Sequence, residues 1–329
     1  MPSPGLSTLP RGKPGVMASL IEDHVKLRGV IPALVTPFNA DGTVNTLMTK
    51  KLVAYHLAEG ANGFYVCGNT GEGAEMTVAE RMQQTQAVVE AANGRPVLVH
   101  VGGCSAADAC VLAKHAKQVG AMGTSAMPPS GASVSVTDIV TYFETIGAAT
   151  DLPFYVYWVP SGISDLNADE FLTAMKTVPC LAGIKYTDKN FFKFQQLMAL
   201  APKILGFPLN ALTGPDEMMV AGLAMGSHGA IGSTYNVNIK LAVKTYNEFV
   251  IGNVTEAARF QARCNDIIEV LIKKSKIYEG GPGTNIIAAI KCLYAARGFD
   301  CGEARAFQLT EVEKADLVET VESLRFEYA

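Results

Sequence analysis

The sequence of 329 residues contains no apolar run of the roughly 18 residues that a bilayer span requires. It also lacks any cluster of lysine and arginine with interleaved aromatic side chains, and its formal net charge is −4. A chain without a basic face has no electrostatic footprint for nucleic acid. We therefore expect neither a membrane nor a nucleic-acid partner. The composition, 49% hydrophobic and 18% charged, is typical of a well-packed globular protein.

Cysteine and histidine occur without the spacing of a disulfide or metal site. The seven cysteines form no C-x-x-C pair, and an odd number in a chain of this length argues against a disulfide scaffold. Reduced, mostly buried thiols in a cytosolic protein are the economical interpretation. The five histidines show no ligand-like spacing, and His100 is interpreted as a hydrogen-bonded core residue. No G-x-G-x-x-G follows an expected strand. We expect no metal and no bound cofactor.

Residues 1–28 differ in composition from the rest of the chain. The stretch over 1–16 is rich in proline, glycine and serine, and its only charged side chains are Arg11 and Lys13. It lacks the apolar core of a secretory signal. We interpret residues 1–28 as a disordered extension. A transit peptide is the alternative, with Met17 as an alternative start.

From residue 29 onward, short apolar runs alternate with longer amphipathic segments. The expected strands are Val30–Thr36, Gly63–Cys67, Pro96–Val101, Gly123–Met127, Pro153–Val159, Leu181–Thr187, Ile204–Leu212 and Gly229–Ser233. Strand–helix units repeated in this way predict an α/β fold, a closed (β/α)₈ TIM barrel rather than an open doubly wound sheet. We assign 29–250 to the barrel and 251–329 to a helical extension packed on it.

Helix start and stop signals lie between these runs. Thr77-Val78-Ala79-Glu80 matches a capping box, and Ser105 precedes an amphipathic segment that should end at Gly120. Asn167 opens a further helix. Beyond residue 250 the strands stop, and the pattern predicts helices over 254–274, 284–296 and 309–325.

Lys185 is the one cation inside the expected strand Leu181–Thr187. A hydrated ammonium is unfavourable in a strand interior unless its pKa falls, and a desolvated lysine can attack a ketone to form an imine. The alternative is an outward lysine whose stem lies on the sheet while its head reaches water. Alternation along the strand puts Lys185 on the same face as Gly183 and Thr187.

The same alternation predicts that certain side chains of the second and fifth strands share an inward face: Tyr65, Cys67, Asn69, Tyr155 and Tyr157. Barrel active sites lie at the C-terminal ends of the strands. Lys185, Tyr157 and the Asn69–Thr70 turn should therefore converge on one mouth. An amine, a phenol that shuttles protons and a turn that binds a carboxylate are the parts that a keto-acid imine reaction requires.

Three motifs, Gly63–Gly73, Tyr157–Pro160 and Gly183–Thr187, resemble in sequence and order the dihydrodipicolinate synthase / N-acetylneuraminate lyase family of class I aldolases. The similarity runs from about residue 29 to the C-terminal helices. Within this family the chain most resembles the N-acetylneuraminate lyases, through Gly214–Glu217 and Gly232–Asn236. The resemblance implies a TIM barrel that works without a metal or cofactor.

The resemblance also implies a role for each site residue. Lys185 forms the imine with the keto carbon of pyruvate or of the sugar acid, and Tyr157 relays the proton that accompanies carbon–carbon cleavage. The positions implied to contact substrate are Asn69, Thr70, Thr187, Gly214, Asp216, Glu217 and Ser233. The Asn69–Thr70 turn would hold the carboxylate. The sugar hydroxyls would be held by Thr187, Asp216, Glu217 and Ser233. As alternatives, Pro215–Glu217 is also a good helix start, and Asn69–Thr70 is also a strand-ending turn.

Two segments depart from the family pattern. Family members usually carry an aromatic residue after the fourth strand, which reaches the site of a neighbouring subunit, but Met127–Ser133 contains none. Proton transfer would then pass through Thr70, a serine or water. The segment Ser161–Ser164 also lacks the arginine that synthases use to bind a second carboxylate, which counts against dihydrodipicolinate synthase.

These features predict an aldolase that cleaves N-acetylneuraminate reversibly to N-acetylmannosamine and pyruvate. Three alternatives stay open: an aldolase for another 2-keto-3-deoxy sugar acid, a dihydrodipicolinate synthase-like condensation, and a catalytically silent binding protein for keto acids or sugar acids. The expected partners are small molecules, a keto acid and an amino sugar. Because the family usually forms homotetramers, we expect a homotetramer, located in the cytoplasm.

Overall fold

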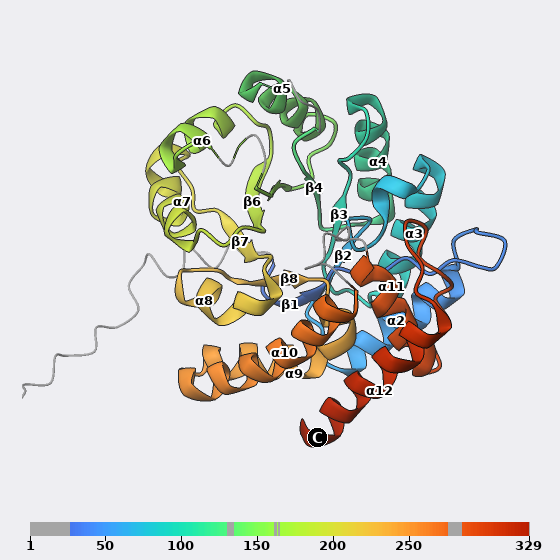
Figure 1. Ribbon diagram of the computed structural model, residues 1–329. Helices are drawn as coiled ribbons and strands as arrows, with labels where there is room; N and C mark the ends of the chain where they lie inside the picture. Colours follow the sequence, from blue (N-terminus) through green and yellow to red (C-terminus); the bar gives the residue numbers. More distant parts are fainter. Residues whose placement is uncertain (1–26, 130–134, 161–162, 164, 276–284, 329) are drawn as a thin grey trace, which may run out of the picture.

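The strands of the protein form one closed parallel barrel. The computed structural model describes residues 27–129, 135–160, 163, 165–275 and 285–328 (Figure 1). The strands are β1 (Gly29–Pro32), β2 (Phe64–Val66), β3 (Val97–His100), β4 (Gly123–Ala126), β5 (Phe154–Trp158), β6 (Leu181–Tyr186), β7 (Asn210–Thr213) and β8 (Gly229–Gly232). Their order in the eight-stranded sheet is β1-β8-β7-β6-β5-β4-β3-β2. A bridge between Ala33 and Tyr65 joins the two ends of this sheet, so the predicted TIM barrel is confirmed.

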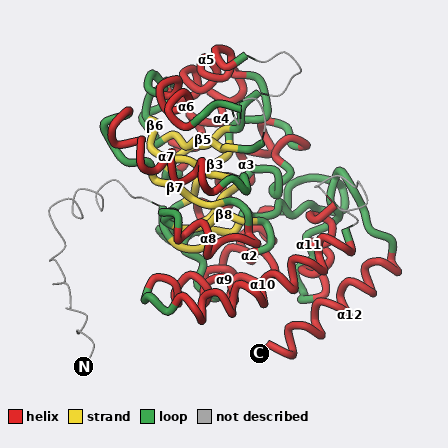
Figure 2. Tube along the Cα trace, turned by 60° about the vertical axis from the view of Figure 1, so that its left-hand side comes forward, coloured by secondary structure: helices red, strands yellow, loops and turns green. Residues whose placement is uncertain are grey.

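A helix follows each strand and packs on the outside of the ring (Figures 1 and 2). The helices are α2 (Thr46–Ala58), α3 (Val78–Ala91), α4 (Ala106–Val119), α5 (Val136–Gly147), α6 (Ala168–Met175), α7 (Phe191–Ile204), α8 (Met219–Ala224), α9 (Tyr235–Val250), α10 (Val254–Lys274), α11 (Asn285–Ala296) and α12 (Glu311–Tyr328). In the described part of the chain, no helix combines the length and hydrophobicity needed to cross a membrane.

Side-chain alternation separates two apolar layers. One layer fills the inside of the barrel, with Tyr65, Tyr155, Tyr157, Leu212 and Ile231 among its members. The other layer lies between the strands and the surrounding helices, and its members include Val66, Val156, Trp158, Ile184 and Tyr186. Strands that are buried on both faces in this way read as continuous apolar runs, which is why the sequence indicates them clearly.

The predicted caps are present at the helix ends. Thr77 and Glu80 form the reciprocal capping box at the start of α3, and Ser105 Oγ accepts a hydrogen bond from the Asp108 backbone amide at 3.1 Å at the start of α4. Gly120 ends α4 with φ of 87°, a left-handed conformation that favours glycine. Side chains of this kind satisfy amide groups that have no partner within the helix.

The prediction of a strand over Ile204–Leu212 was wrong for the residues before Asn210. Helix α7 continues to Ile204, Gly206 turns the chain with φ of 88°, and β7 begins only at Asn210. The apolar residues Leu205 and Phe207 belong to this turn and pack against the outer apolar layer. A short apolar run at the end of a helix has no period that separates it from a strand.

Helices α9, α10 and α12 lie together on one side of the barrel (Figure 2). Helix α10 packs along both α9 and α12, and α11 contacts α9, α10 and α12. The division of the chain at residue 250 stays a prediction, as does the nature of residues 1–28, of which 1–26 lie outside the described residues.

All seven cysteines are free: Cys67, Cys264 and Cys301 are buried, whereas Cys180 is exposed. The prediction that most of the thiols are buried was therefore wrong.

Candidate active site

Lys185 points into the barrel from β6. It is 5% exposed and lines a cavity at the C-terminal end of the strands. Its Nζ atom lies 3.9 Å from the ring centroid of Tyr157 and 4.1 Å from that of Tyr65. The alternative of an outward lysine with its head in bulk water is therefore wrong.

The surroundings of Lys185 favour the neutral amine. Burial lowers its pKa from 10.5 to about 7, and the negative charge of Asp216 opposes only part of this shift. No ion pair within the described ranges includes Lys185. A pKa near 7 leaves about half of the amine neutral at neutral pH, and the neutral form is the nucleophile.

Tyr157 stands directly beside Lys185, because the two residues are register partners on β5 and β6. Burial raises the pKa of the phenol to about 12, Thr187 lowers it and the charge of Asp216 raises it further. The phenol therefore carries its proton at neutral pH, positioned next to the amine. It can donate that proton to a developing alkoxide.

Two hydroxyl groups meet at the mouth, from the ends of β2 and β8, the two strands that flank β1. Thr70, in the turn after β2, and Ser233, directly after β8, are joined by a hydrogen bond of 2.8 Å between their Oγ atoms. Asn69 is exposed and lines the same cavity. The turn is held from behind because the Thr36 hydroxyl donates to the Gly71 carbonyl at 2.6 Å. The Asn69–Thr70 turn thus faces Lys185, as predicted.

Cys67 does not share the inward face of Tyr65, so this part of the prediction was wrong. Its φ is 58°, which ends the strand alternation one residue after β2. Its Sγ atom turns toward α3, where it contacts the carbonyl oxygen of Arg81 and the hydroxyl of Thr85. Asn69 and Thr70 therefore reach the mouth through the turn and not through strand alternation.

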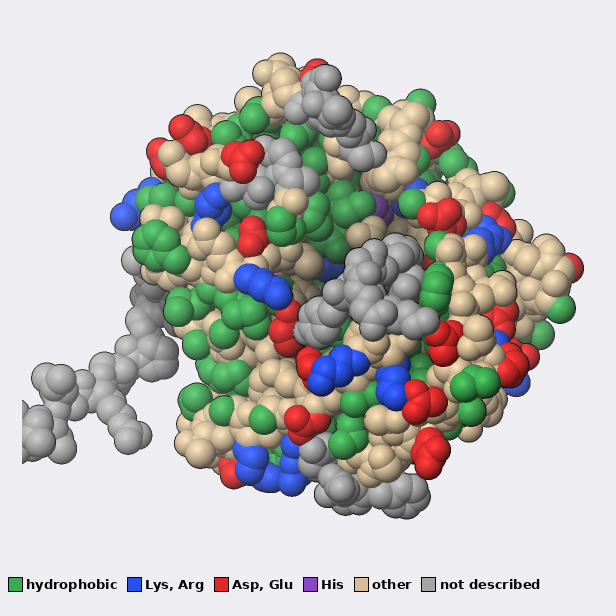
Figure 3. Space-filling model, in the orientation of Figure 1, with side chains coloured by type: hydrophobic (Ala, Val, Ile, Leu, Met, Phe, Trp, Pro, Cys, Tyr) green, Lys and Arg blue, Asp and Glu red, His purple; other side chains and the backbone are tan. Residues whose placement is uncertain are grey.

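Two adjoining cavities open at this end of the barrel, on the face that Figure 3 shows. The inner cavity, of about 360 Å³, is lined by Asn69, Thr70, Tyr157, Lys185, Thr187, Gly214, Ile231, Ser233, Ile286 and Ile287. The outer cavity, of about 700 Å³, shares Thr187, Gly214, Ser233 and Ile286 with it. The two cavities therefore adjoin along these four shared residues.

The shared wall between the cavities is shaped by a glycine and a hydroxyl group. A Cβ atom at Gly214 would lie 1.9 Å from Oγ1 of Thr187, so only glycine fits there. The Thr187 hydroxyl is buried and has no partner of regular hydrogen-bond geometry within the described chain, although it lies close enough to the Tyr157 phenol to lower the pKa of that group. A ligand that spans the two cavities would pass this hydroxyl.

Asp216 and Glu217 line the outer cavity but differ in environment. Asp216 is buried, and its Oδ2 accepts hydrogen bonds from the backbone amide of Thr234 at 2.7 Å and from its hydroxyl at 2.6 Å. Burial raises the pKa of Asp216 to about 6 against these hydrogen bonds. Glu217 lies 3.7 Å from Lys189 near the surface. The pair also opens a 3₁₀ turn after Pro215, so the helix-start interpretation is confirmed as well.

Some cavity residues were not predicted. Ile286 and Ile287 at the start of α11 cover the inner cavity, and Asn265 of α10 lines the outer one. The amphipathic pattern of a helix predicts its buried face but not which end meets the barrel. Tyr65 was predicted to point inward, but alternation alone gave no indication that its ring would contact the amine.

Parts of the predicted site lie outside the described residues. They include 130–134 of the loop without an aromatic residue, and 161, 162 and 164 of the segment without an arginine. Within the described ranges, no three histidine, cysteine or acidic side chains are grouped so that they could hold a metal ion. His100 is buried between the rings of Tyr65 and Tyr157, and its Nε2 accepts a hydrogen bond from the Met127 amide at 3.3 Å.

Comparison with known proteins identifies the family. Residues 26–317 match the family model described as the dihydrodipicolinate synthetase family. The chain belongs to this family. It is 32% identical over 294 residues to an N-acetylneuraminate lyase of Rhizobium meliloti. This alignment covers 89% of this chain and 93% of that protein. It is 34% identical over 254 residues to the enzyme of the same name from Salmonella paratyphi B, covering 75% of this chain and 82% of that protein.

Solved structures are similar to this protein over most of the chain. The N-acetylneuraminate lyase of Proteus mirabilis superposes with a TM-score of 0.78 at 32% identity, over 92% of this chain and 99% of that one. The N-acetylneuraminate lyase of Aliivibrio salmonicida superposes with a TM-score of 0.81 at 28% identity, over 92% and 98% of the two chains.

Proposed function

We propose that this protein is a Schiff-base aldolase that cleaves N-acetylneuraminate reversibly to N-acetylmannosamine and pyruvate. The observation that carries the proposal is the Lys185 amine, buried with a pKa of about 7 and 3.9 Å from the ring centroid of Tyr157. The similarity to proteins named N-acetylneuraminate lyase supports this choice of substrate.

The first chemical step would form the imine. Neutral Lys185 attacks the keto carbon of the open-chain sugar acid, water leaves, and a protonated imine results. This imine accepts the electron pair of the breaking C3–C4 bond, so cleavage leaves an enamine instead of a bare carbanion. Protonation of the enamine and hydrolysis of the imine then release pyruvate and restore the amine.

Tyr157 would move the proton that accompanies cleavage. The C4 hydroxyl loses its proton as the aldehyde forms, and in condensation the phenol returns a proton to the new alkoxide. The positive charge of the protonated imine favours the phenolate until cleavage converts the imine into the enamine, and this opposes the effect of burial, which raises the pKa of Tyr157 to about 12. The proton relay proposed here needs no aromatic residue from the loop after β4.

The two cavities would divide the substrate between them. The Thr70 and Ser233 hydroxyls and the amides of the Asn69–Thr70 turn suit the carboxylate of the keto acid. The sugar hydroxyls would lie in the outer cavity. They would contact Thr187 and Gly214 at the wall shared with the inner cavity, and Asp216 and Glu217 beyond it. Acidic side chains there accept hydrogen bonds from a polyol but repel a second carboxylate, which disfavours dihydrodipicolinate synthase chemistry.

We further propose that the enzyme works in the cytosol as a homotetramer and needs no cofactor beyond the imine. The free cysteines agree with a reducing compartment. The tetramer is inferred from the family resemblance alone. The molecular mass of the purified protein in solution, by light scattering, tests the tetramer.

Borohydride reduction in the presence of pyruvate, followed by peptide mapping, tests the mechanism. We expect a reduced adduct on Lys185, and none in a Lys185→Ala variant. Turnover assays with N-acetylneuraminate and with other 2-keto-3-deoxy sugar acids then test the substrate. An adduct without turnover on any of them indicates a silent binding protein, and preferred turnover of another sugar acid replaces the proposed substrate. Absence of an adduct contradicts the imine mechanism itself.

A further inference from the structure

A second buried lysine lies close to the site without touching the reacting groups. Lys291 of α11 has a side chain that is 2% exposed, and its Nζ atom lies 2.6 Å from Oε1 of Glu72, whose side chain is 1% exposed. Removing two charges from water is costly, so a buried ion pair is weak evidence for a role in stability. Its place in the fold points instead to a role in positioning.

Glu72 belongs to the turn that carries Thr70. Its backbone amide donates to the carbonyl of Asn69 at 3.0 Å, and its φ of 54° lies in the left-handed region. A residue other than glycine seldom adopts this conformation unless its surroundings hold it, and such residues cluster at ligand clamps. Whatever holds the Glu72 side chain therefore also fixes the orientation of the Asn69–Thr70 turn.

Lys291 belongs to the helix that covers the inner cavity. It follows Ile287 by four residues, so the two side chains lie on the same face of α11. Ile286 and Ile287 line the same inner cavity as Asn69 and Thr70. The Lys291 ammonium also donates to the carbonyl of Glu303 at 3.1 Å. The ion pair thus connects two walls of one cavity.

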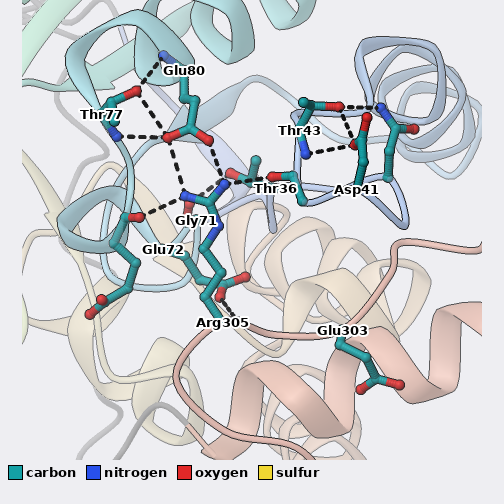
Figure 4. A network of polar contacts seen from close by, with 12 residues as sticks. Thr36, Asp41, Thr43, Gly71, Glu72, Thr77, Glu80, Glu303 and Arg305 are labelled. Atoms are coloured by element: carbon teal, nitrogen blue, oxygen red, sulfur yellow. Dashed lines mark hydrogen bonds and ion pairs between the residues drawn. The ribbon is translucent and has the colours of Figure 1, made fainter.

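The segment between α11 and α12 also contacts Glu72. The backbone amide of Arg305 donates to Oε2 of Glu72 at 2.6 Å, so both carboxylate oxygens of Glu72 are engaged. The Arg305 guanidinium points to Glu80 at the start of α3 (Figure 4). It also donates to the Glu75 carbonyl at 2.7 Å. These contacts anchor the turn from the side away from the cavity.

We propose that the Glu72–Lys291 ion pair is a positioning device for keto-acid binding. It holds the Asn69–Thr70 turn and the start of α11 at the separation that the keto-acid carboxylate requires. The inference rests on the proposed function for the identity of the ligand as a 2-keto acid. Lys291 and Glu72 act through Thr70 and Ile287 and do not touch the substrate.

The experiment compares three variants with the wild type. Glu72→Gln keeps the shape of the side chain and removes its charge, and the double variant Glu72→Gln, Lys291→Met removes both charges so that none stays buried without a partner. The control is Arg297→Met, because Arg297 directly follows the same helix and its ion pair, with Glu322 of α12, does not involve the Asn69–Thr70 turn. Circular dichroism and thermal denaturation first establish that each variant is folded.

The readout separates keto-acid binding from chemistry and from sugar binding. The pyruvate concentration for half-maximal borohydride trapping should rise by roughly tenfold in both Glu72 variants. Trapping at saturating pyruvate and the KM for N-acetylmannosamine in condensation should stay within about twofold, because Lys185 and the outer cavity are untouched. Arg297→Met should change none of these values.

Three results would overturn the inference. If a folded Glu72 variant keeps the wild-type pyruvate concentration for half-maximal trapping, the ion pair has no role in keto-acid binding. If Arg297→Met raises this concentration equally, or if the KM for N-acetylmannosamine rises in parallel, the effect is a general loosening of the structure. If the double variant does not fold, Glu72→Gln alone decides the question. Failure of the wild type to form any pyruvate adduct would instead contradict the proposed function, so the two failures are distinguishable.

Discussion

Replacing Lys185 by methionine should stabilise the protein while it abolishes imine formation. The side chain is 5% exposed and lies against the rings of Tyr65 and Tyr157, surroundings that suit an apolar chain of similar length. The amine is retained at this position at the cost of stability. The pKa of Lys185 gives the size of that cost and its dependence on pH.

The cost follows from the difference between the folded and unfolded pKa. Burial lowers the pKa of Lys185 from 10.5 to about 7, and one pKa unit corresponds to about 1.4 kcal/mol, so the cost below pH 7 is on the order of 5 kcal/mol. Above pH 7 the folded amine is neutral while the unfolded one is still protonated. The unfolded state then binds more protons, so the wild-type free energy of unfolding gains about 1.4 kcal/mol per pH unit from this residue.

Urea denaturation of the wild type and Lys185→Met between pH 7 and pH 9 tests this reasoning. The variant should be the more stable protein at pH 7, and its advantage should shrink by roughly 2 kcal/mol by pH 9. Asp216, which has a pKa of about 6, titrates below this window. Lys240→Met, on the exposed side of α9, gives the reference for removing a surface lysine.

A constant difference between wild type and variant over this range would refute the lowered pKa. A second readout is independent of unfolding. The rate of borohydride trapping by the wild type should rise with the neutral fraction of Lys185, from about a tenth at pH 6 to about nine tenths at pH 8.

Three further perturbations test other parts of the site. Tyr157→Phe should lower turnover by about 10²- to 10⁴-fold while pyruvate trapping persists, and unchanged turnover would remove the phenol from the mechanism. Glu217→Gln should raise the KM for the sugar acid in steady-state assays and leave half-saturation of trapping by pyruvate unchanged; a shift in the latter would contradict its place in the outer cavity. Thr234→Val should lower the free energy of unfolding by about 1–3 kcal/mol, because buried Asp216 loses a hydrogen-bond donor. This loss should be larger at pH 8 than at pH 5, where Asp216 is protonated, and Thr245→Val serves as the control in thermal denaturation.

The inward placement of Lys185 and Tyr157 was predictable because strand alternation is a local rule. Lys185 and Tyr157 each lie one residue before the end of a strand, where parity still decides which face a side chain takes. The structure makes them register partners on neighbouring strands. The rule failed at Cys67, one residue beyond β2, because a positive φ ends the alternation. Strand alternation also did not predict where α7 ends and β7 begins, because apolar residues occupy the turn between them.

The sequence by itself determined the eightfold alternation of strand and helix, the inward amine and phenol, and the family. These depend on period and on short motifs, which are properties of neighbouring residues. Only the tertiary structure decided that the start of α11 covers the inner cavity, that Thr234 holds Asp216, and that Lys291 pairs with Glu72. Contacts of this kind join residues far apart in the chain, and their geometry is set by how whole helices dock on the barrel. No local pattern in the sequence encodes that docking.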